Sequence, residues 1–350
     1  MALRRLPGRA LLAVGGKDAQ ALVKGLLSCD ADVLHAPHAA GSVAGARCSY
    51  GALLTSGGRV LFDVFAHKGP QAVDEAGEGA VLVECSSDAA ESLAVALERR
   101  KGAADCVIKR VPPRRLAVAA AFTADALEYS RGGEQEQWEG SSEGEELGGA
   151  AAFLCADPRA PLVARRGVVP TSAVSWAESF LDAEGYRAWR YALGLPCGPQ
   201  ELTPGTLSAL EANLDALHGL RPGGGFVGAD YLALRKRLRG GREVRRVMPV
   251  TLGGEGAAKA QAGDEIVLAR TGSGSLKDGV GRLLAAEEGR GLALLRVEPS
   301  LAAAVEPNAP PLLSAIGREE RWAKADPAHA FTVKPHVPSW WPRDWLAAAV

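Results

Sequence analysis

The chain has 350 residues, of which 47% are hydrophobic, and its formal net charge is −1. This length suffices for a sizeable core and two or three domains, while the balanced charge excludes a global attraction to nucleic acid or anionic lipid. No apolar run approaches the roughly 20 residues of a membrane-spanning helix, so we expect no membrane span. The six cysteines are scattered singly, without a C-x-x-C pair, which favours free thiols over a disulfide framework or a metal site.

The first third of the chain predicts a mixture of strands and helices. Two β-rich runs flank a Thr-Ser-Gly-Gly turn and make residues 48–68 the clearest hairpin in the sequence. Residues 89–100 have helical spacing and end on two arginines, as the helix dipole favours. Short apolar runs predict further strands at residues 10–16, 81–85 and 115–122.

Residues 125–150 form an acidic segment that predicts a solvated loop. Eight acidic residues face one basic residue, Arg131, and glycine and serine lie between them. The segment contains a G-x-S-x-G match at residues 140–144, but a nucleophile elbow requires a strand before the serine and a helix after it. We therefore assign this match no catalytic role.

The middle of the chain predicts two helices and a glycine turn. Helices are expected at residues 171–193, where Gly194 is placed to end the helix, and at 206–218. Three glycines at positions 223, 225 and 228 then show the spacing of a dinucleotide-binding turn. They follow a helical pattern and a proline instead of a buried strand, which argues against nucleotide binding.

A basic segment follows the glycine turn and is the one local patch suited to a polyanion. It combines seven basic residues with a single acidic one, and clustered guanidinium groups bind oxyanions bidentately. The alternative is a solvated face without a ligand. The basic residues are Arg235, Lys236, Arg237, Arg239, Arg242, Arg245 and Arg246.

The C-terminal part predicts a small β-barrel followed by an unusual tail. Short β-like runs alternate with glycine turns from residue 244 onward. Residues 331–350 contain three of the seven tryptophans, Trp340, Trp341 and Trp345, among several prolines. Because exposed tryptophan is unfavourable, we expect this tail to dock against its own domains or against a partner.

The order of these segments resembles the YgfZ proteins, which share the fold of the glycine-cleavage T-protein, an aminomethyltransferase. The hairpin "YGALLTSGGRVLFDVF" is similar to the family's hairpin, with Gly58, Arg59 and Asp63 as its Gly-Arg-x-x-x-Asp ending. The segments "ADPRAPLVARRGVVP" and "LSALEANLD" resemble the family's Asp-Pro-Arg and Glu-x-Asn regions, and the runs from residue 245 to 298 resemble its C-terminal barrel.

The resemblance implies an α+β fold, in which two interleaved α+β subdomains and a C-terminal β-barrel form a ring. We expect the interleaved subdomains at residues 1–242, the barrel at 243–325 and the Trp/Pro-rich tail at 326–350. The resemblance also implies a central channel that could bind tetrahydrofolate. Its candidate lining residues are Tyr50, Asp63, Arg159, Glu211, Asn213, Asp230 and Tyr231, several of which could instead brace turns or fill the core.

Two departures from the family argue against catalysis. The family signature K-G-C-Y-x-G-Q-E, aligned from Phe226, places Asp230 at the cysteine and keeps only Tyr231. A carboxylate cannot form a disulfide or persulfide and is a harder metal ligand than a thiolate. Ala192 stands where the T-protein has a pterin-gripping glutamate, so aminomethyl transfer is not expected.

The resemblance implies a mitochondrial matrix protein that acts with other proteins as an accessory factor in iron–sulfur protein maturation. The altered signature and the tryptophan tail favour an alternative, a catalytically silent subunit of a large organellar complex. A folate-dependent enzyme is the third hypothesis. No metal site is expected from the residue spacing.

Overall fold

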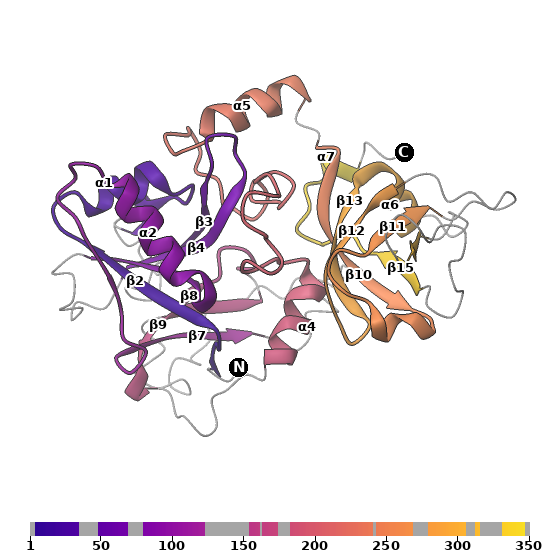
Figure 1. Ribbon diagram of the computed structural model, residues 1–350, viewed down its shortest axis with the longest axis horizontal. Helices are drawn as coiled ribbons and strands as arrows, with labels where there is room; N and C mark the ends of the chain where they lie inside the picture. The colour runs from indigo at the N-terminus through magenta and orange to yellow at the C-terminus, as the bar shows by residue number, and fades with distance from the viewer. Residues whose placement is uncertain are drawn as a thin grey trace, which may run out of the picture.

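The structure is a computed structural model, and all statements about it concern residues 4–34, 48–68, 80–122, 154–161, 163–173, 183–240, 243–268, 279–305, 312–315 and 331–346. The acidic segment 125–150 and Arg242 lie outside the described residues. Figure 1 shows two sheets with their helices on one side, the barrel on the other, and helix α4 between them.

The first sheet is antiparallel and has the strand order β3-β4-β5-β2-β6. Its strands are β2 (Arg9–Gly15), β3 (Cys48–Leu54), β4 (Val60–Lys68), β5 (Val81–Ser86) and β6 (Val107–Arg110). Helices α1 (Ala19–Leu26) and α2 (Ala90–Arg100) bury their apolar stripes, including Leu22 and Leu93, against it. The predicted hairpin, strands and helix α2 of this region are confirmed.

The second sheet has the order β1-β7-β9-β8, with β1 (Arg4–Arg5), β7 (Leu116–Phe122), β8 (Leu154–Ala156) and β9 (Ala164–Pro170). Its first strand precedes the whole first sheet in the chain, whereas its other strands follow it. The chain thus passes from one sheet to the other and back, which is the interleaving that the resemblance implied. The α+β fold is confirmed.

Helix α4 (Ala183–Leu193) ends at Gly194, whose φ of 71° is the left-handed conformation expected after a helix. The helix expected at residues 206–218 does not form, and consecutive turns take its place. Asn213 and His218 have φ values of 62° and 57°, which a right-handed helix cannot contain. The amide of Leu214 bonds to Ala209 instead of continuing an i−4 ladder.

The C-terminal unit is a closed antiparallel barrel of order β10-β13-β12-β11-β14-β15. The strands are β10 (Arg245–Gly253), β11 (Glu265–Leu268), β12 (Gly279–Glu287), β13 (Arg290–Arg296), β14 (Leu312–Ala315) and β15 (Phe331–Pro335). Strand β15 pairs with both β10 and β14 and closes the barrel. The barrel therefore extends past residue 325, where the tail was expected to begin.

The remaining helices are short or lie at the edges of these units. They are α5 (Ala229–Leu238), α6 (Val297–Val305) and α7 (Arg343–Leu346), with 3-10 turns at Ala31–Leu34, Ser87–Ala89, Thr171–Ala173 and Glu255–Lys259. One apolar core joins the barrel to the sheets, because Val247, Leu292 and Leu294 pack with Trp189 and Tyr191 of α4. In the part of the chain that the structure describes, no helix is long and apolar enough to cross a membrane.

Candidate functional site

A cluster of charged side chains lies between the two sheets and the segment that directly follows helix α4. It combines four arginines with four carboxylates, and we call it the central cluster. Its members are Arg9, Arg159, Arg166, Arg190, Asp63, Glu84, Asp157 and Glu201. The equal numbers of opposite charges allow this many ionisable groups to be buried together.

Glu84 of β5 is the hub of the central cluster. Its carboxylate accepts hydrogen bonds from Arg9 Nε at 2.5 Å, from His67 Nε2 at 2.9 Å and from Arg166 through Nε at 2.9 Å and Nη2. Burial alone would raise the pKa of Glu84, but Arg166 and Arg9 hold it well below its usual value. The carboxylate is therefore ionised, and it binds Arg9 of the first sheet and Arg166 of the second sheet.

Three of the predicted channel residues lie at the edge of this cluster. Arg159 Nη2 donates to Asp157 at 3.0 Å, and its guanidinium lies 5.4 Å from the ring centroid of Tyr50. Asp63 Oδ1 accepts the amide hydrogen of Gly198 at 2.9 Å. The structure thus brings Tyr50, Asp63 and Arg159 together, which their positions in the sequence alone do not show.

Several buried polar atoms at this edge have no hydrogen-bond partner among the described residues. They are Tyr50 Oη, Asp63 Oδ2, Arg159 Nη1 and Arg9 Nη2. Buried polar groups in folded proteins are nearly always satisfied, if necessary by ordered water or a ligand. Donors and acceptors are both present, so the site suits water or another small polar molecule.

The same site does not offer a free stacking surface for the pterin ring of a folate. The ring of Phe65 has the guanidinium of Arg166 at 4.1 Å and that of Arg159 at 4.7 Å from its centroid. Ala192 supplies no carboxylate to the ring's donors. Among the described residues at this site, Asp63 is the carboxylate with an unpartnered oxygen, and the residues present do not fit tetrahydrofolate as they are packed here.

Cys197 also lies at this site, although no sequence pattern predicted its position there. Its Sγ lies 3.1 Å from Arg9 Nη1, and its amide donates to Glu201 at 2.7 Å. A cavity of about 240 Å³ is lined by Cys197, Arg9, Arg190 and Glu201. Burial raises the pKa of the Cys197 thiol, although Arg9 favours the thiolate, so the thiol stays protonated near neutral pH.

Glu211 and Asn213 have structural contacts at the junction with the barrel. Glu211 accepts the amide hydrogen of Ser208 at 2.9 Å and binds Arg245 at 2.7 Å, and Asn213 Nδ2 donates to the carbonyl of Val247 at 2.7 Å. Both residues are buried. They brace the turn segment against β10 and do not reach the unpartnered atoms of the central cluster.

Asp230 and Tyr231 lie away from the central cluster, on the exposed surface of α5, where the side chain of Tyr231 is half-exposed. The glycine turn before them explains the local structure. Gly228 has a φ of 86° and lies so close to the hairpin turn that a Cβ would come within 2.6 Å of the Thr55 carbonyl oxygen. Only glycine fits at this position.

This geometry favours a different register for the family signature. The two glycines of K-G-C-Y-x-G-Q-E are four residues apart, and so are Gly224 and Gly228, which both have left-handed conformations. Phe226 then matches the tyrosine, Gly225 the cysteine and Asp230 the glutamate. The signature cysteine is absent in either register.

The basic segment is largely paired within the protein. Arg235 and Arg239 bind Glu243, Lys236 and Arg246 contact Asp215, and Arg245 binds Glu211. Arg246 is buried and cannot contribute to an exposed surface. Arg237 alone of the described members forms no ion pair, so this segment offers less free charge to a polyanion than its composition suggests.

The three tail tryptophans pack against the chain itself. Trp341 is buried in the barrel core, Trp340 Nε1 donates to the carbonyl of Leu193 at 2.7 Å, and the Trp345 ring lies under the guanidinium of Arg246. These contacts favour the first of the two expected docking modes. In this arrangement, the tryptophans are not displayed as anchors for a partner.

Comparisons with known proteins agree with the fold and the barrel. A family described as the C-terminal beta-barrel domain of CAF17 matches residues 245–343. The solved structure of the glycine cleavage system aminomethyltransferase T from Bartonella henselae aligns with a TM-score of 0.57 over 97% of this chain and 86% of that chain, at 15% identity. At this identity, the structural likeness shows the fold alone.

Sequence relatives are named as mitochondrial iron–sulfur cluster assembly factors. The Neurospora crassa IBA57 homolog is 29% identical over 73% of this chain, and human IBA57 is 29% identical over 67%. The mouse protein is 28% identical over 84% of this chain and 77% of its own length. The matches span only 55% of the Neurospora protein and 64% of the human protein.

These comparisons agree with the α+β fold, the barrel and the sequence resemblance. The chain is therefore similar in sequence to the mitochondrial iron–sulfur cluster assembly factors of the YgfZ type, and it has the fold of the glycine-cleavage T-protein.

Proposed function

We propose that the chain acts in the mitochondrial matrix as an accessory factor for the maturation of iron–sulfur proteins, together with other proteins. The observation that carries this proposal is the similarity to several relatives, all named as mitochondrial iron–sulfur cluster assembly factors, over 67% to 84% of this chain. The fold and the barrel family support it.

The chain performs this function without a thiolate at the centre of the fold. The signature cysteine is absent in both registers, and the Cys197 thiol is protonated because burial raises its pKa. Within the described residues, no group of three histidine, cysteine or carboxylate side chains could hold a metal ion. Binding to partner proteins is the mode of action that we propose, with the central cluster as a rigid support of the fold.

The test is depletion of the protein from cells that make it, followed by activity measurements on mitochondrial iron–sulfur enzymes. Their activity is expected to fall at unchanged polypeptide abundance and to return when the protein is restored. Mitochondrial enzymes that contain no cluster serve as the control. Full iron–sulfur enzyme activity after depletion would contradict the proposal.

The loss of the signature cysteine also favours a second candidate, a silent member of the fold that is a subunit of a large organellar complex. Native size separation of gentle organelle lysates distinguishes the two functions. An accessory factor migrates mostly free, whereas a subunit co-migrates with one large complex at fixed stoichiometry. Deletion of residues 331–350 is unsuitable for this test because it would remove strand β15 from the barrel.

A further inference from the structure

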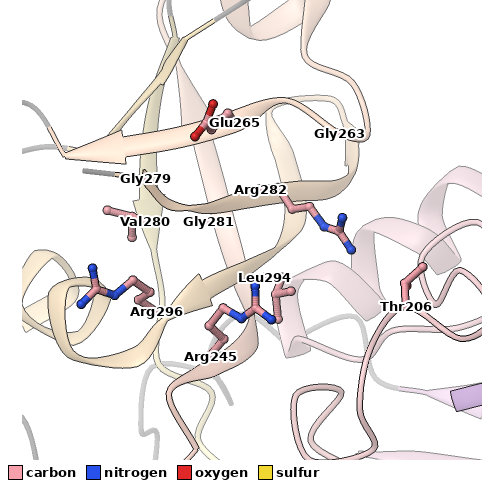
Figure 2. A pocket seen from close by; sticks show the side chains of 10 residues that line it. All are labelled: Thr206, Arg245, Gly263, Glu265, Gly279, Val280, Gly281, Arg282, Leu294 and Arg296. Atoms are coloured by element: carbon pink, nitrogen blue, oxygen red, sulfur yellow. The ribbon is translucent and has the colours of Figure 1, made fainter. Parts of the chain in front are cut away.

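Three arginines from neighbouring barrel strands line one cavity at the edge of the barrel; in Figure 2 the side chains of Arg245 and Arg282 extend toward the side of Thr206, and that of Arg296 extends the other way. Arg245 of β10 lies directly opposite Arg296 of β13 in the ladder. Arg282 of β12 lies opposite Leu294, two residues from Arg296 on the same strand. Because residues two apart on a strand share a face, the three side chains belong to one face of the sheet.

The positive charge at this edge is only partly neutralised. Arg245 donates to Glu211 through Nε and Nη2, which leaves its Nη1 group to donate to another acceptor. Within the described ranges, neither Arg282 nor Arg296 forms an ion pair, and Glu265, opposite Arg282 in the ladder, does not pair with it. Among the described residues, Arg282 and Arg296 therefore carry the unpaired positive charge at this edge, beside the partly paired Arg245.

The arginines line a cavity of about 630 Å³, which we call the rim pocket. Glycines 263, 279 and 281 leave much of its floor without side chains, and a Cβ at Gly281 would come within 2.0 Å of the Leu294 carbonyl oxygen. Thr206 of the N-terminal unit forms the opposite wall, and Figure 2 shows the Arg282 side chain extending toward it. This volume lies within the usual range of small-molecule sites.

We propose that the rim pocket binds a small molecule carrying two or more linked phosphate groups. Guanidinium groups bind phosphate oxygens through paired hydrogen bonds, and a chain of phosphates can engage neighbouring arginines at once. A single carboxylate would neutralise only one of them. This site is separate from the central cluster and does not depend on the proposed role in iron–sulfur maturation.

The position of the rim pocket gives its ligand a structural effect. Arg282 and Arg296 belong to the barrel, whereas Thr206 belongs to the turn segment that Arg59 of the hairpin loop holds through the Thr206 carbonyl at 2.6 Å. A ligand in contact with both walls connects the barrel to the sheets. It therefore raises the melting temperature of the full chain, by an amount that grows with the ratio of free ligand concentration to Kd.

Calorimetric titration of the full chain with inorganic tripolyphosphate tests the proposal, with citrate as a multivalent carboxylate for comparison. Tripolyphosphate is expected to bind at one site and to raise the melting temperature, with citrate weaker. The double variant Arg282→Gln/Arg296→Gln should bind at least about tenfold more weakly. Arg99→Gln/Arg237→Gln, which removes two exposed arginines elsewhere, is the charge-matched control and should bind as the parent does.

A second variant approaches the site from the other wall. Thr206→Glu places a carboxylate opposite the arginines and should also weaken binding, while the variants without ligand melt no lower than the parent. ATP titrated in parallel distinguishes a nucleotide from a free oligophosphate, since tighter binding of ATP assigns the nucleotide. No binding, equal binding by citrate, or equal losses in the Arg99/Arg237 control would overturn the proposal.

Discussion

The central cluster and the rim pocket are both rich in arginine, but they differ in their carboxylates. In the central cluster, each of four arginines is near a buried carboxylate, and Glu84 alone binds two of them. At the rim pocket, Arg282 and Arg296 form no ion pair within the described residues. The first arrangement makes arginine part of the framework, whereas the second leaves it available to an external anion.

The same comparison explains the basic segment 235–246, which the sequence marks as the most cationic part of the chain. Most of its described members bind Glu243, Asp215 or Glu211. The less neutralised cluster combines Arg245 with two arginines far away in the sequence, at 282 and 296. The density of charge along a sequence is therefore a poor guide to free charge on the folded protein.

The largest expected effect comes from removing the hub of the central cluster. Glu84→Gln leaves the guanidinium groups of Arg9 and Arg166 buried without a counter-charge, and should lower the free energy of unfolding by about 3–5 kcal/mol. Urea denaturation measures this. Glu91→Gln, an exposed carboxylate on α2, is the control and should change it by less than about 1 kcal/mol. A cost for Glu84→Gln as small as that of the control would contradict the structural role.

The second-largest effect is expected from acid, which should lower the stability that the central cluster contributes. The pKa values of Glu84 and Asp157 are below their ordinary values of 4.5 and 3.8, because neighbouring arginines outweigh the effect of burial. Below these values the unfolded chain takes up protons that the folded chain does not, so stability is lost as the pH falls. Each carboxylate contributes about 1.4 kcal/mol per pH unit. Urea midpoints that stay constant from about pH 5 to 3 would rule out the lowered pKa values.

A paired substitution within the basic segment sharpens the contrast between framework and free arginine. Arg246 donates to the Leu210 carbonyl at 2.8 Å and to Asp215 at 3.0 Å, so Arg246→Gln should cost about 2–3 kcal/mol of stability. Arg237→Gln, on the exposed face of α5, should change stability by less than about 0.5 kcal/mol. Equal effects of the two changes on the urea midpoint would show that the segment is one uniform surface.

The smallest effect on stability is expected at the rim pocket. Here the substitution should stabilise the protein, whereas the preceding ones destabilise it. Arg296→Gln removes a positive charge that faces Arg245 across the ladder, and should raise the stability of the ligand-free chain by a few tenths of a kcal/mol. Added salt should reduce this gain because it screens the repulsion. A loss of about 1 kcal/mol or more on substitution would mean that Arg296 has a structural role.

The sequence predicted those elements whose periodicity and turn residues lie within one short segment of the chain. The hairpin at 48–68, helix α2 and the barrel strands have clear periodicity and turn residues. The helix expected at 206–218 was wrong because its apolar spacing reflects burial at a junction between units. Contacts of Asn213 and Glu211 with β10 and Arg245 impose turns there. The closing strand β15 was missed because its prolines and the nearby tryptophans indicated an irregular tail.

The candidate site was predictable only in part. The resemblance named Tyr50, Asp63 and Arg159, which the structure brings together beside unpartnered polar atoms. It did not name Glu84, Arg166 or Arg9, since a buried ion-pair network depends on which strands face each other across two sheets. Cys197 was likewise not among the predicted site residues, because only the fold places it 3.1 Å from Arg9.

The central claim is that the chain supports iron–sulfur protein maturation without a thiolate at the core of its fold. The most direct test is rescue of depleted cells with Cys197→Ser, since a serine hydroxyl can keep the hydrogen bond from Arg9 while it removes the sulfur. We predict that this variant restores mitochondrial iron–sulfur enzyme activity to the level reached with the parent protein at equal abundance. Restoration by the parent but not by Cys197→Ser would contradict the claim and assign the chemistry to this thiol.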